Sequence, residues 1–250
     1  MNVKIIIKYD GSPFFGWQKT STGPSVQEAL EEALCRVLSR DKVPVEAASR
    51  TDRGVHAKGQ AAHFVLEEPR DLAKLQFGLN SVLPQEIRIS SMEIAPPHFH
   101  PTLDASSKEY RYQICMGTVQ EPIHRAYSWH VPHCLDQAAM QKAAQLLVGT
   151  HNFSSFTTLP IEEGRRTLFE ISLVPLPENR LEIRLIGERF LYKMARRIAG
   201  TLVDVGKERL TLENISKLLT TPDRAAAGIT APAHGLHLHQ VFYPQSKELS

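Results

Sequence analysis

The chain has 250 residues, of which 42% are hydrophobic and 22% charged, as in an ordinary globular protein. Its formal net charge of only +2 does not indicate a nucleic-acid partner, so such an argument must rest on local clusters of cations. Three distant cysteines (Cys35, Cys115 and Cys134) form neither a disulfide framework nor a thiolate zinc site. Because the sequence also shows no membrane span and no signal peptide, we expect a protein of the cytoplasm.

The first hundred residues predict the element order β-α-β-β-α-β. Residues 4–9, a short segment with three β-branched isoleucines, predict a strand. Ser25, followed three residues later by Glu28, predicts the start of a helix. A second helix is expected from Asp71 to near Pro84. Further strands are predicted at residues 43–49, 60–66 and 87–94. This order is that of ferredoxin-like folds, which RNA-recognition modules share.

The second half of the chain repeats this order with extra elements. Tyrosines alternating with polar residues near position 110 predict a strand. Residues 168–174 and 181–186 predict a hairpin. Helices are expected at residues 135–148, 189–205 and 212–219, and a last strand at residues 236–242. We therefore expect an α+β fold of two similar halves, residues 1–104 and 105–250.

The segment of residues 49–60 contains the strongest candidate for chemistry. Asp52 lies between Arg50 and Arg53, with Lys58 close in sequence, and nearby cations favour the ionised form of a carboxylate. An ionised aspartate can act as a nucleophile or a base. The alternative is an ordinary surface turn, which Asp and Gly favour, and the residues alone give this alternative more weight. A glycosidase would need a second carboxylate, which the segment does not offer.

A basic patch is predicted on the helix of residues 189–205. Apolar residues recur at helical spacing on one face of this helix. Four basic residues occupy the opposite face: Arg189, Lys193, Arg196 and Arg197. Such a face can neutralise phosphates, and salt would then weaken binding. The alternative is a solvated face above a core stripe, which is the default for exposed charges.

Aromatic residues in two places allow either stacking on bases or ordinary packing. Tyr110 and Tyr112 alternate along a strand, so they either stack on an unpaired base or pack within the sheet. Phe14, Phe15 and Trp17 lie in a polar loop, where they must be buried or meet a ligand. Close histidine pairs match no specific metal signature, and no glycine-rich phosphate loop occurs. We therefore expect neither a metal nor a nucleotide cofactor.

Together these segments resemble the tRNA pseudouridine synthase A family almost end to end. The resemblance rests on Tyr9-Asp10-Gly11, Phe15-Gly16-Trp17-Gln18, Val26-Gln27, Arg50-Thr51-Asp52, Gly54-Val55-His56-Ala57, Gly59-Gln60, Asn80 with Leu83-Pro84, Tyr110-Arg111-Tyr112, Phe190-Leu191, Met194, Arg196, Gly200 and Gly235-Leu236. Each motif is short, and their common order gives the match its specificity. The resemblance implies the pseudouridine synthase fold, in which two pseudo-symmetric ferredoxin-like or RRM-like halves share a largely antiparallel sheet. Helices would pack on one side, and RNA would bind in a cleft between the halves.

The same resemblance implies an isomerase that converts uridine to pseudouridine in the anticodon stem-loop of tRNA, at tRNA positions 38, 39 and 40. It implies a homodimer that works without cofactor or metal, and in which one tRNA touches both subunits. Asp52 would be the catalytic aspartate, Tyr110 would pack on the target base, and Arg196 would form an ion pair with the catalytic aspartate. Arg50 would help to fix the flipped nucleotide. The candidate RNA contacts are Arg53, Lys58, Arg189, Lys193 and Arg197.

Five positions depart from the family pattern, at Ser49, Arg53, Thr102, Lys108 and Ala195. The family usually has Gly, Ala, Arg, Arg and Val at these positions, in the same order. Two rival functions stay open. A non-catalytic RNA-binding protein would be indicated by loss of the aspartate, and a nucleoside or glycoside hydrolase by a second carboxylate.

The substrate constrains the expected mechanism. A uridine inside a stem must be flipped out before chemistry can reach it. Asp52 would then attack C1′ of the ribose, attack the base, or take a proton from the sugar, and the sequence leaves these three routes open.

Overall fold

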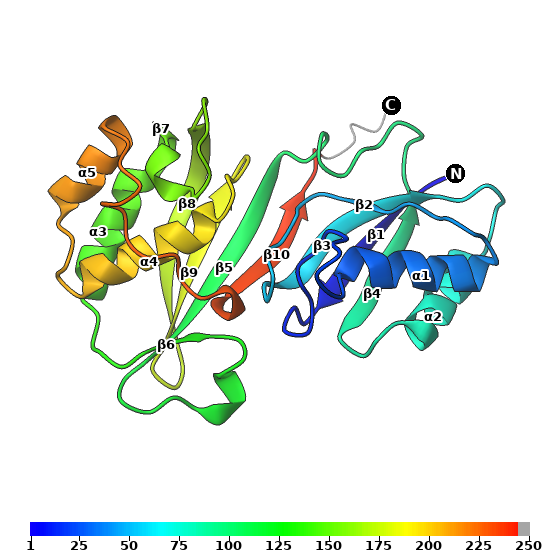
Figure 1. Ribbon diagram of the computed structural model, residues 1–250, viewed down its shortest axis with the longest axis horizontal. Coiled ribbons are helices and arrows are strands. Elements are labelled where there is room, and N and C mark those ends of the chain that lie inside the picture. Colours follow the sequence, from blue (N-terminus) through cyan, green and yellow to red (C-terminus); the bar gives the residue numbers. More distant parts are fainter. Residues whose placement is uncertain (245–250) are drawn as a thin grey trace. The chain divides into compact units, whose positions relative to one another are not determined.

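The computed structural model describes residues 1–244, which form two compact units. Unit 1 consists of residues 1–106 and 238–244, and unit 2 of residues 107–237. Figure 1 shows the helices and strands of both units. Among the residues described, no helix has the length and apolar character needed to span a membrane.

Unit 1 has the predicted β-α-β-β-α-β order. Its elements are β1 (Asn2–Tyr9), α1 (Val26–Leu38), β2 (Glu46–Ala47), β3 (His56–Val65), α2 (Leu72–Val82) and β4 (Ile87–Ile94). The strands β4, β1 and β3 lie side by side in that order and are antiparallel, and the short β2 pairs with β3. Helices α1 and α2 cover the same face of this sheet (Figure 1).

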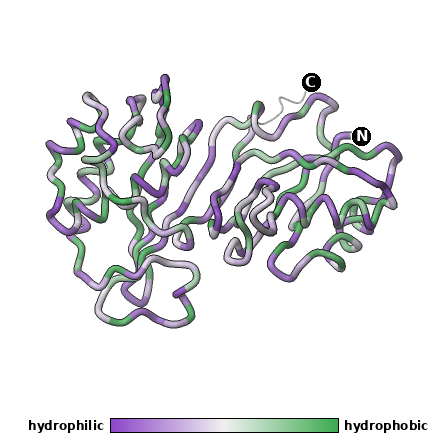
Figure 2. The backbone as a smooth tube through the Cα atoms, in the orientation of Figure 1, coloured by the Kyte–Doolittle hydropathy of each residue, from purple (hydrophilic) through white to green (hydrophobic). Residues whose placement is uncertain are grey.

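Both helices of unit 1 begin where the sequence predicts. The side chain of Ser25 accepts a hydrogen bond from the backbone N–H of Glu28, at 3.2 Å. The side chain of Asp71 accepts two such bonds at the start of α2. These caps satisfy backbone donors that a helix start leaves without partners. Figure 2 shows hydrophobic and hydrophilic stretches interspersed along the chain. On β1, the alternate residues Val3 and Ile5 are fully buried in the core.

Unit 2 is built around a second antiparallel sheet region. Its strands and helices are β5 (Ser107–Met116), β6 (Trp129–Val131), α3 (Gln137–Leu147), β7 (Gly149–Asn152), β8 (Arg165–Leu176), β9 (Arg180–Gly187), α4 (Met194–Gly206) and α5 (Leu212–Thr220). The strand order is β5-β9-β8-β7, all antiparallel, with β6 parallel to β5. The last strand, β10 (Leu236–Phe242), runs from unit 2 into unit 1. The α+β class is confirmed.

The predicted strand at residues 43–49 is wrong except for Glu46 and Ala47. Instead, side chains of α1 form hydrogen bonds with the backbone of Val45. The Val45 N–H donates to Glu31 Oε1, and the Val45 carbonyl accepts from Gln27 Nε2. A backbone held in this way is not available to a neighbouring strand.

The predicted helix at residues 189–205 begins five residues late, at Met194. Lys193 has a left-handed backbone with a φ of 58°, which cannot continue a right-handed helix. Arg189 therefore lies outside α4. The expected solvated basic face is also wrong for Arg197, whose side chain is only 8% exposed and donates to the carbonyl of Arg224.

Candidate active site

Asp52 occupies the first position of a tight turn between β2 and β3. The backbone N–H of Val55 donates to the Asp52 carbonyl at 3.1 Å. Gly54, the third residue of the turn, has a φ of 75°, a conformation that favours glycine. The sequence Asp-Arg-Gly-Val therefore specifies this turn and leaves the Asp52 side chain half-buried.

Residues 10–24, called here the aromatic loop, pack against the backbone just before this turn. The Trp17 N–H donates to the Thr51 carbonyl at 3.0 Å. The hydroxyls of Tyr9 and Thr51 share a hydrogen bond of 2.8 Å. Gly16, with a φ of 105°, permits this contact, because a Cβ there would lie 2.7 Å from the Thr51 carbonyl oxygen. Phe14 and Trp17 are buried, so these two aromatics belong to the core rather than to a ligand site.

Buried polar side chains hold both ends of the segment that contains Asp52. Gln60 donates from Nε2 to the Ser49 carbonyl and accepts from the Ser49 N–H. On the other side of the turn, His56 Nδ1 accepts from the Gly11 N–H at 3.1 Å. Both Gln60 and His56 are almost completely buried. The backbone around Asp52 is therefore fixed by residues within unit 1.

The cations around Asp52 are exposed. Arg50, Arg53 and Lys58 are all on the surface, and in the described part of the chain none of them forms an ion pair with a carboxylate. The guanidinium of Arg53 lies over the ring of Phe15, 4.0 Å from its centroid. Cations that no acid neutralises favour an anionic ligand at this surface.

The two tyrosines of β5 differ in their surroundings. Tyr110 is 6% exposed, and its ring meets Phe190 edge to face with the centroids 4.8 Å apart. Tyr112 is fully buried and donates from its hydroxyl to the Pro232 carbonyl at 2.8 Å. Burial raises the pKa of Tyr112, although Arg196 opposes the rise. Tyr112 is therefore a packing residue.

Arg196 is held by a reciprocal pair of hydrogen bonds in unit 2. Its Nε donates to the Ala231 carbonyl at 2.8 Å, and the Ala231 N–H donates to the Arg196 carbonyl at 3.2 Å. One helical turn later, Gly200 permits the approach of this segment, because a Cβ there would lie 1.9 Å from the Ile229 carbonyl oxygen. The position of Arg196 thus depends on residues 229–231.

Lys108 lies two residues before Tyr110 on β5 and is half-buried. Burial, and to a smaller extent the nearby charge of Arg189, lowers the pKa of Lys108 to about 8. A lysine at this position therefore carries a charge that depends on pH near neutrality, which an arginine would not.

The predicted site residues fall into two groups, one in each unit. Unit 1 brings together the residues of the turn and its flanks, Arg50, Asp52, Arg53 and Lys58. Unit 2 contains Tyr110, Arg189, Lys193, Arg196 and Arg197. That Asp52 meets Tyr110 and Arg196 on one uridine stays a prediction. The sequence interpretation assigned no role to Gln60 or Ala231, because only the tertiary fold shows their contacts.

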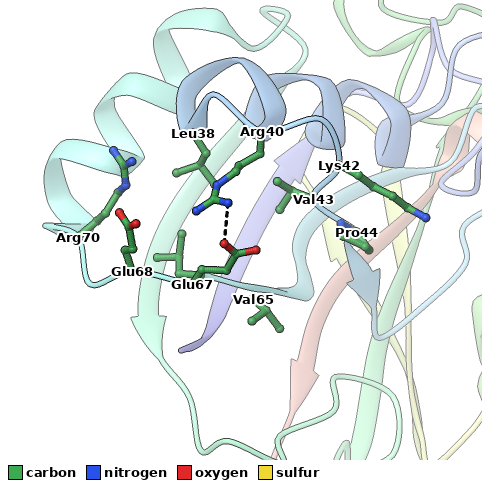
Figure 3. Close-up of a pocket in the computed structure, with 10 residues that line it drawn as sticks. Leu38, Arg40, Lys42, Val43, Pro44, Val65, Glu67, Glu68 and Arg70 are labelled. Atoms are coloured by element: carbon green, nitrogen blue, oxygen red, sulfur yellow. Dashed lines mark ion pairs between the residues drawn. The ribbon is translucent and has the colours of Figure 1, made fainter.

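A small pocket of unit 1 lies at the far end of α1 (Figure 3). Its lining mixes cations and carboxylates, with Arg40 and Glu67 paired at 2.6 Å. The aromatic loop contacts the first residues of α1, whereas the pocket includes Leu38 at the last. The 13 residues of α1 span about 20 Å at 1.5 Å per residue. The pocket is therefore separate from the Asp52 turn.

Residues 5–103 and 143–244 match the family model described as tRNA pseudouridine synthase. The chain belongs to this family of pseudouridine synthases. Within it, the chain is similar over nearly its whole length to proteins named tRNA pseudouridine synthase A.

Three such relatives illustrate the similarity. One from Protochlamydia amoebophila, named tRNA pseudouridine synthase A 2, is 46% identical over 97% of this chain and 94% of its own length. Relatives named tRNA pseudouridine synthase A from Pelobacter propionicus and Bacillus licheniformis are 43% and 40% identical, over 96% and 97% of this chain and 99% of their own lengths. Among solved structures, a Cbf5-Nop10-Gar1 complex aligns over 96% of this chain and 50% of that chain, at 11% identity and a TM-score of 0.39. This last similarity is too low to bear on function.

Proposed function

We propose that this protein is an isomerase that converts uridine to pseudouridine in the anticodon stem-loop of tRNA, with Asp52 as the catalytic carboxylate and without a cofactor. The observation that carries the proposal is the anchored turn at Asp52, flanked by Arg50, Arg53 and Lys58, none of which pairs with a carboxylate within residues 1–244. An RNA backbone is the anionic partner that such a surface fits.

The reaction rearranges one nucleotide without adding or removing atoms overall. The target uridine leaves the stack, which costs a few kcal/mol. Its N1–C1′ bond breaks, a new C5–C1′ bond forms, and the hydrogen at C5 is exchanged for a proton at N1. Asp52 starts this sequence, Tyr110 holds the detached base by stacking, and Arg196 pairs with the catalytic carboxylate. Arg50 fixes the flipped nucleotide.

Further RNA contacts are proposed for cations of both units that are exposed or half-buried. Lys58 lies near Asp52, and Arg189 and Lys193 lie just before α4. Arg197 is left out because its burial leaves little of the side chain for a phosphate. The protein is further proposed to act in the cytoplasm as a homodimer, with one tRNA touching both subunits.

The test uses tRNA that carries tritium at C5 of its uridines. Isomerisation releases this tritium to water, simple binding releases none, and hydrolysis leaves an abasic site. We expect release by the wild type, and no detectable release by Asp52→Asn, which should bind tRNA about as tightly as the wild type. Substantial release by a well-folded Asp52→Asn variant would exclude Asp52 as the catalytic group.

A further inference from the structure

The side chain of Arg53 is held in place before any ligand binds. Its guanidinium carbon lies 4.0 Å from the centroid of the Phe15 ring, within the range of a cation–π contact. The ring is itself fixed. The Phe15 N–H donates to the Pro24 carbonyl at 2.8 Å, and a Cβ on Gly23 would come within 2.5 Å of the ring. Arg53 therefore rests on an anchored aromatic surface.

The hydrogen-bond donors of Arg53 are unused within residues 1–244. No described carboxylate, carbonyl or hydroxyl accepts a hydrogen bond from this side chain, and the residue is exposed. A guanidinium carries five N–H donors in one plane, and no acceptor within residues 1–244 takes those of Arg53. Two parallel N–H donors match two oxygens of a phosphate.

The position of Arg53 limits which phosphate it can reach. Arg53 is the second residue of the turn that Asp52 begins, and the Asp52 carbonyl closes that turn by accepting from the Val55 N–H. Consecutive Cα atoms are about 3.8 Å apart. We therefore expect a phosphate bound by Arg53 to lie close to the nucleotide that Asp52 acts on.

We propose that Arg53 and Phe15 form a phosphate clamp, in which the stacked guanidinium binds a backbone phosphate next to the target uridine. This inference rests on the proposed function, because it requires an RNA substrate. The clamp acts on binding rather than on chemistry. Stacking on Phe15 reduces the rotamer freedom that Arg53 would otherwise lose when the phosphate binds.

The test measures tRNA binding at several salt concentrations together with single-turnover rates. Arg53→Ala should weaken binding about tenfold at 0.1 M salt. It should also reduce the slope of log affinity against log salt by about one, as for the loss of one phosphate contact. The single-turnover rate at saturating enzyme should stay within about twofold of the wild type. Arg53→Lys should keep the slope and lose part of the affinity, because a lysine keeps the charge without the planar fork.

Phe15→Leu tests the role of the ring separately. It should weaken binding less than Arg53→Ala and keep the salt slope, since the charge remains. Added to Arg53→Ala, it should have little further effect on binding, because the ring acts through the guanidinium. Arg70→Ala is the matched control, since it removes an exposed arginine of unit 1 at the opposite end of α1 and should leave slope and rate unchanged.

An unchanged salt slope in Arg53→Ala would overturn the clamp, and so would a loss confined to the single-turnover rate. Arg53 would then stabilise the turn and would not bind a phosphate. Equal losses with Arg70→Ala would overturn it as well, because the effect would then be one of overall charge. If the wild type neither binds tRNA nor releases tritium, the proposed function itself fails. Normal wild-type behaviour with an unaffected Arg53→Ala variant removes only the clamp.

Discussion

Tyr110 and Tyr112 lie on the same face of one strand, yet their surroundings differ. The Tyr112 hydroxyl donates to a backbone carbonyl inside unit 2, whereas the Tyr110 ring meets the Phe190 ring edge to face. Sequence spacing could not separate stacking from packing for either residue. The structure assigns packing to Tyr112 and leaves base stacking as a proposal for Tyr110.

If Tyr110 stacks on the target base, Tyr110→Phe and Tyr110→Leu should differ. Phe keeps the π face, whereas Leu is apolar but lacks it. A stack worth about 1–3 kcal/mol corresponds to roughly a ten- to hundredfold loss of single-turnover rate for Leu, with Phe close to the wild type. Equal losses in both variants would instead assign the role to the hydroxyl. Wild-type rates in both, with folding checked by circular dichroism, would make Tyr110 a packing residue.

Lys108 should titrate near pH 8, because burial and the charge of Arg189 lower its pKa from the ordinary 10.5 to about 8. The folded state then binds this proton less tightly than the unfolded chain does. Between about pH 8 and 10.5 the unfolded state holds more protons, so the free energy of unfolding should rise with pH in that window. NMR titration of the lysine side chain measures the pKa directly, and Arg189→Ala should raise it.

Lys108→Met serves as the reference for the stability measurement. Below pH 8 the methionine variant should be the more stable, since it buries no charge, and its advantage should shrink as the pH rises through the window. A difference between the two proteins that does not change with pH would contradict the lowered pKa.

At the scale of elements, helix α4 depends on a segment far along the chain. Gly200→Ala would force a Cβ to within 1.9 Å of the Ile229 carbonyl, which belongs to backbone and cannot swing aside. We expect a loss of about 1–3 kcal/mol in the free energy of unfolding. Because Ala231 would shift as well, its pair with Arg196 should break and the single-turnover rate should fall.

Gly78→Ala in α2 is the matched control for this prediction. A Cβ there would lie 3.7 Å from Val37 Cγ1, an ordinary contact. Replacing glycine by alanine inside a helix should stabilise the protein by about 0.5–1 kcal/mol. Denaturant unfolding measures both variants, and a Gly200→Ala protein as stable and active as Gly78→Ala would show that residues 229–231 do not position Arg196.

The sequence predicted the elements whose causes are local. Ser25 and Asp71 cap helices through neighbouring backbone, and residues 236–242 alternate as a strand must, so these starts and ends were predictable. The strand expected at residues 43–49 was reduced by side chains of α1, and the burial of Arg197 follows from residues that come 27 positions later. Such contacts between distant segments leave no periodic signal.

For the candidate site as well, the sequence predicted local features and missed contacts between distant segments. The cations around Asp52 could be predicted from the sequence, because all of them lie within residues 50–58. The contact of Arg53 with Phe15 could not be predicted, since the two lie 38 positions apart and only the folded aromatic loop brings them together. The same holds for Gln60, whose bonds to Ser49 close the segment from inside the protein.

For the whole molecule, a net charge of +2 means that tRNA affinity must come from local groups of cations. Affinity should therefore fall steeply with salt, and the double change Arg189→Ala with Lys193→Ala should reduce the salt slope by about two. Arg197→Ala should lower stability instead and leave the slope unchanged, because Arg197 is buried. Binding titrations at several salt concentrations measure these slopes. A slope unaffected by the double change would exclude those residues as phosphate contacts.

The return of the C-terminal strand to unit 1 constrains how the protein folds as it leaves the ribosome. Within unit 1, the Ser106 N–H donates to the Phe242 carbonyl, and Tyr243 packs on Phe99 and donates to the Pro101 carbonyl. Unit 1 therefore emerges first but cannot be completed until the roughly 130 residues of unit 2 have been synthesised, on the order of ten seconds later. Unit 2 is continuous in sequence, so it can complete its fold before unit 1 does, although unit 1 is synthesised first. During that interval the edge of β3 that β10 later covers is open to pairing with other chains, so the first half to be made is the half most exposed to misassembly.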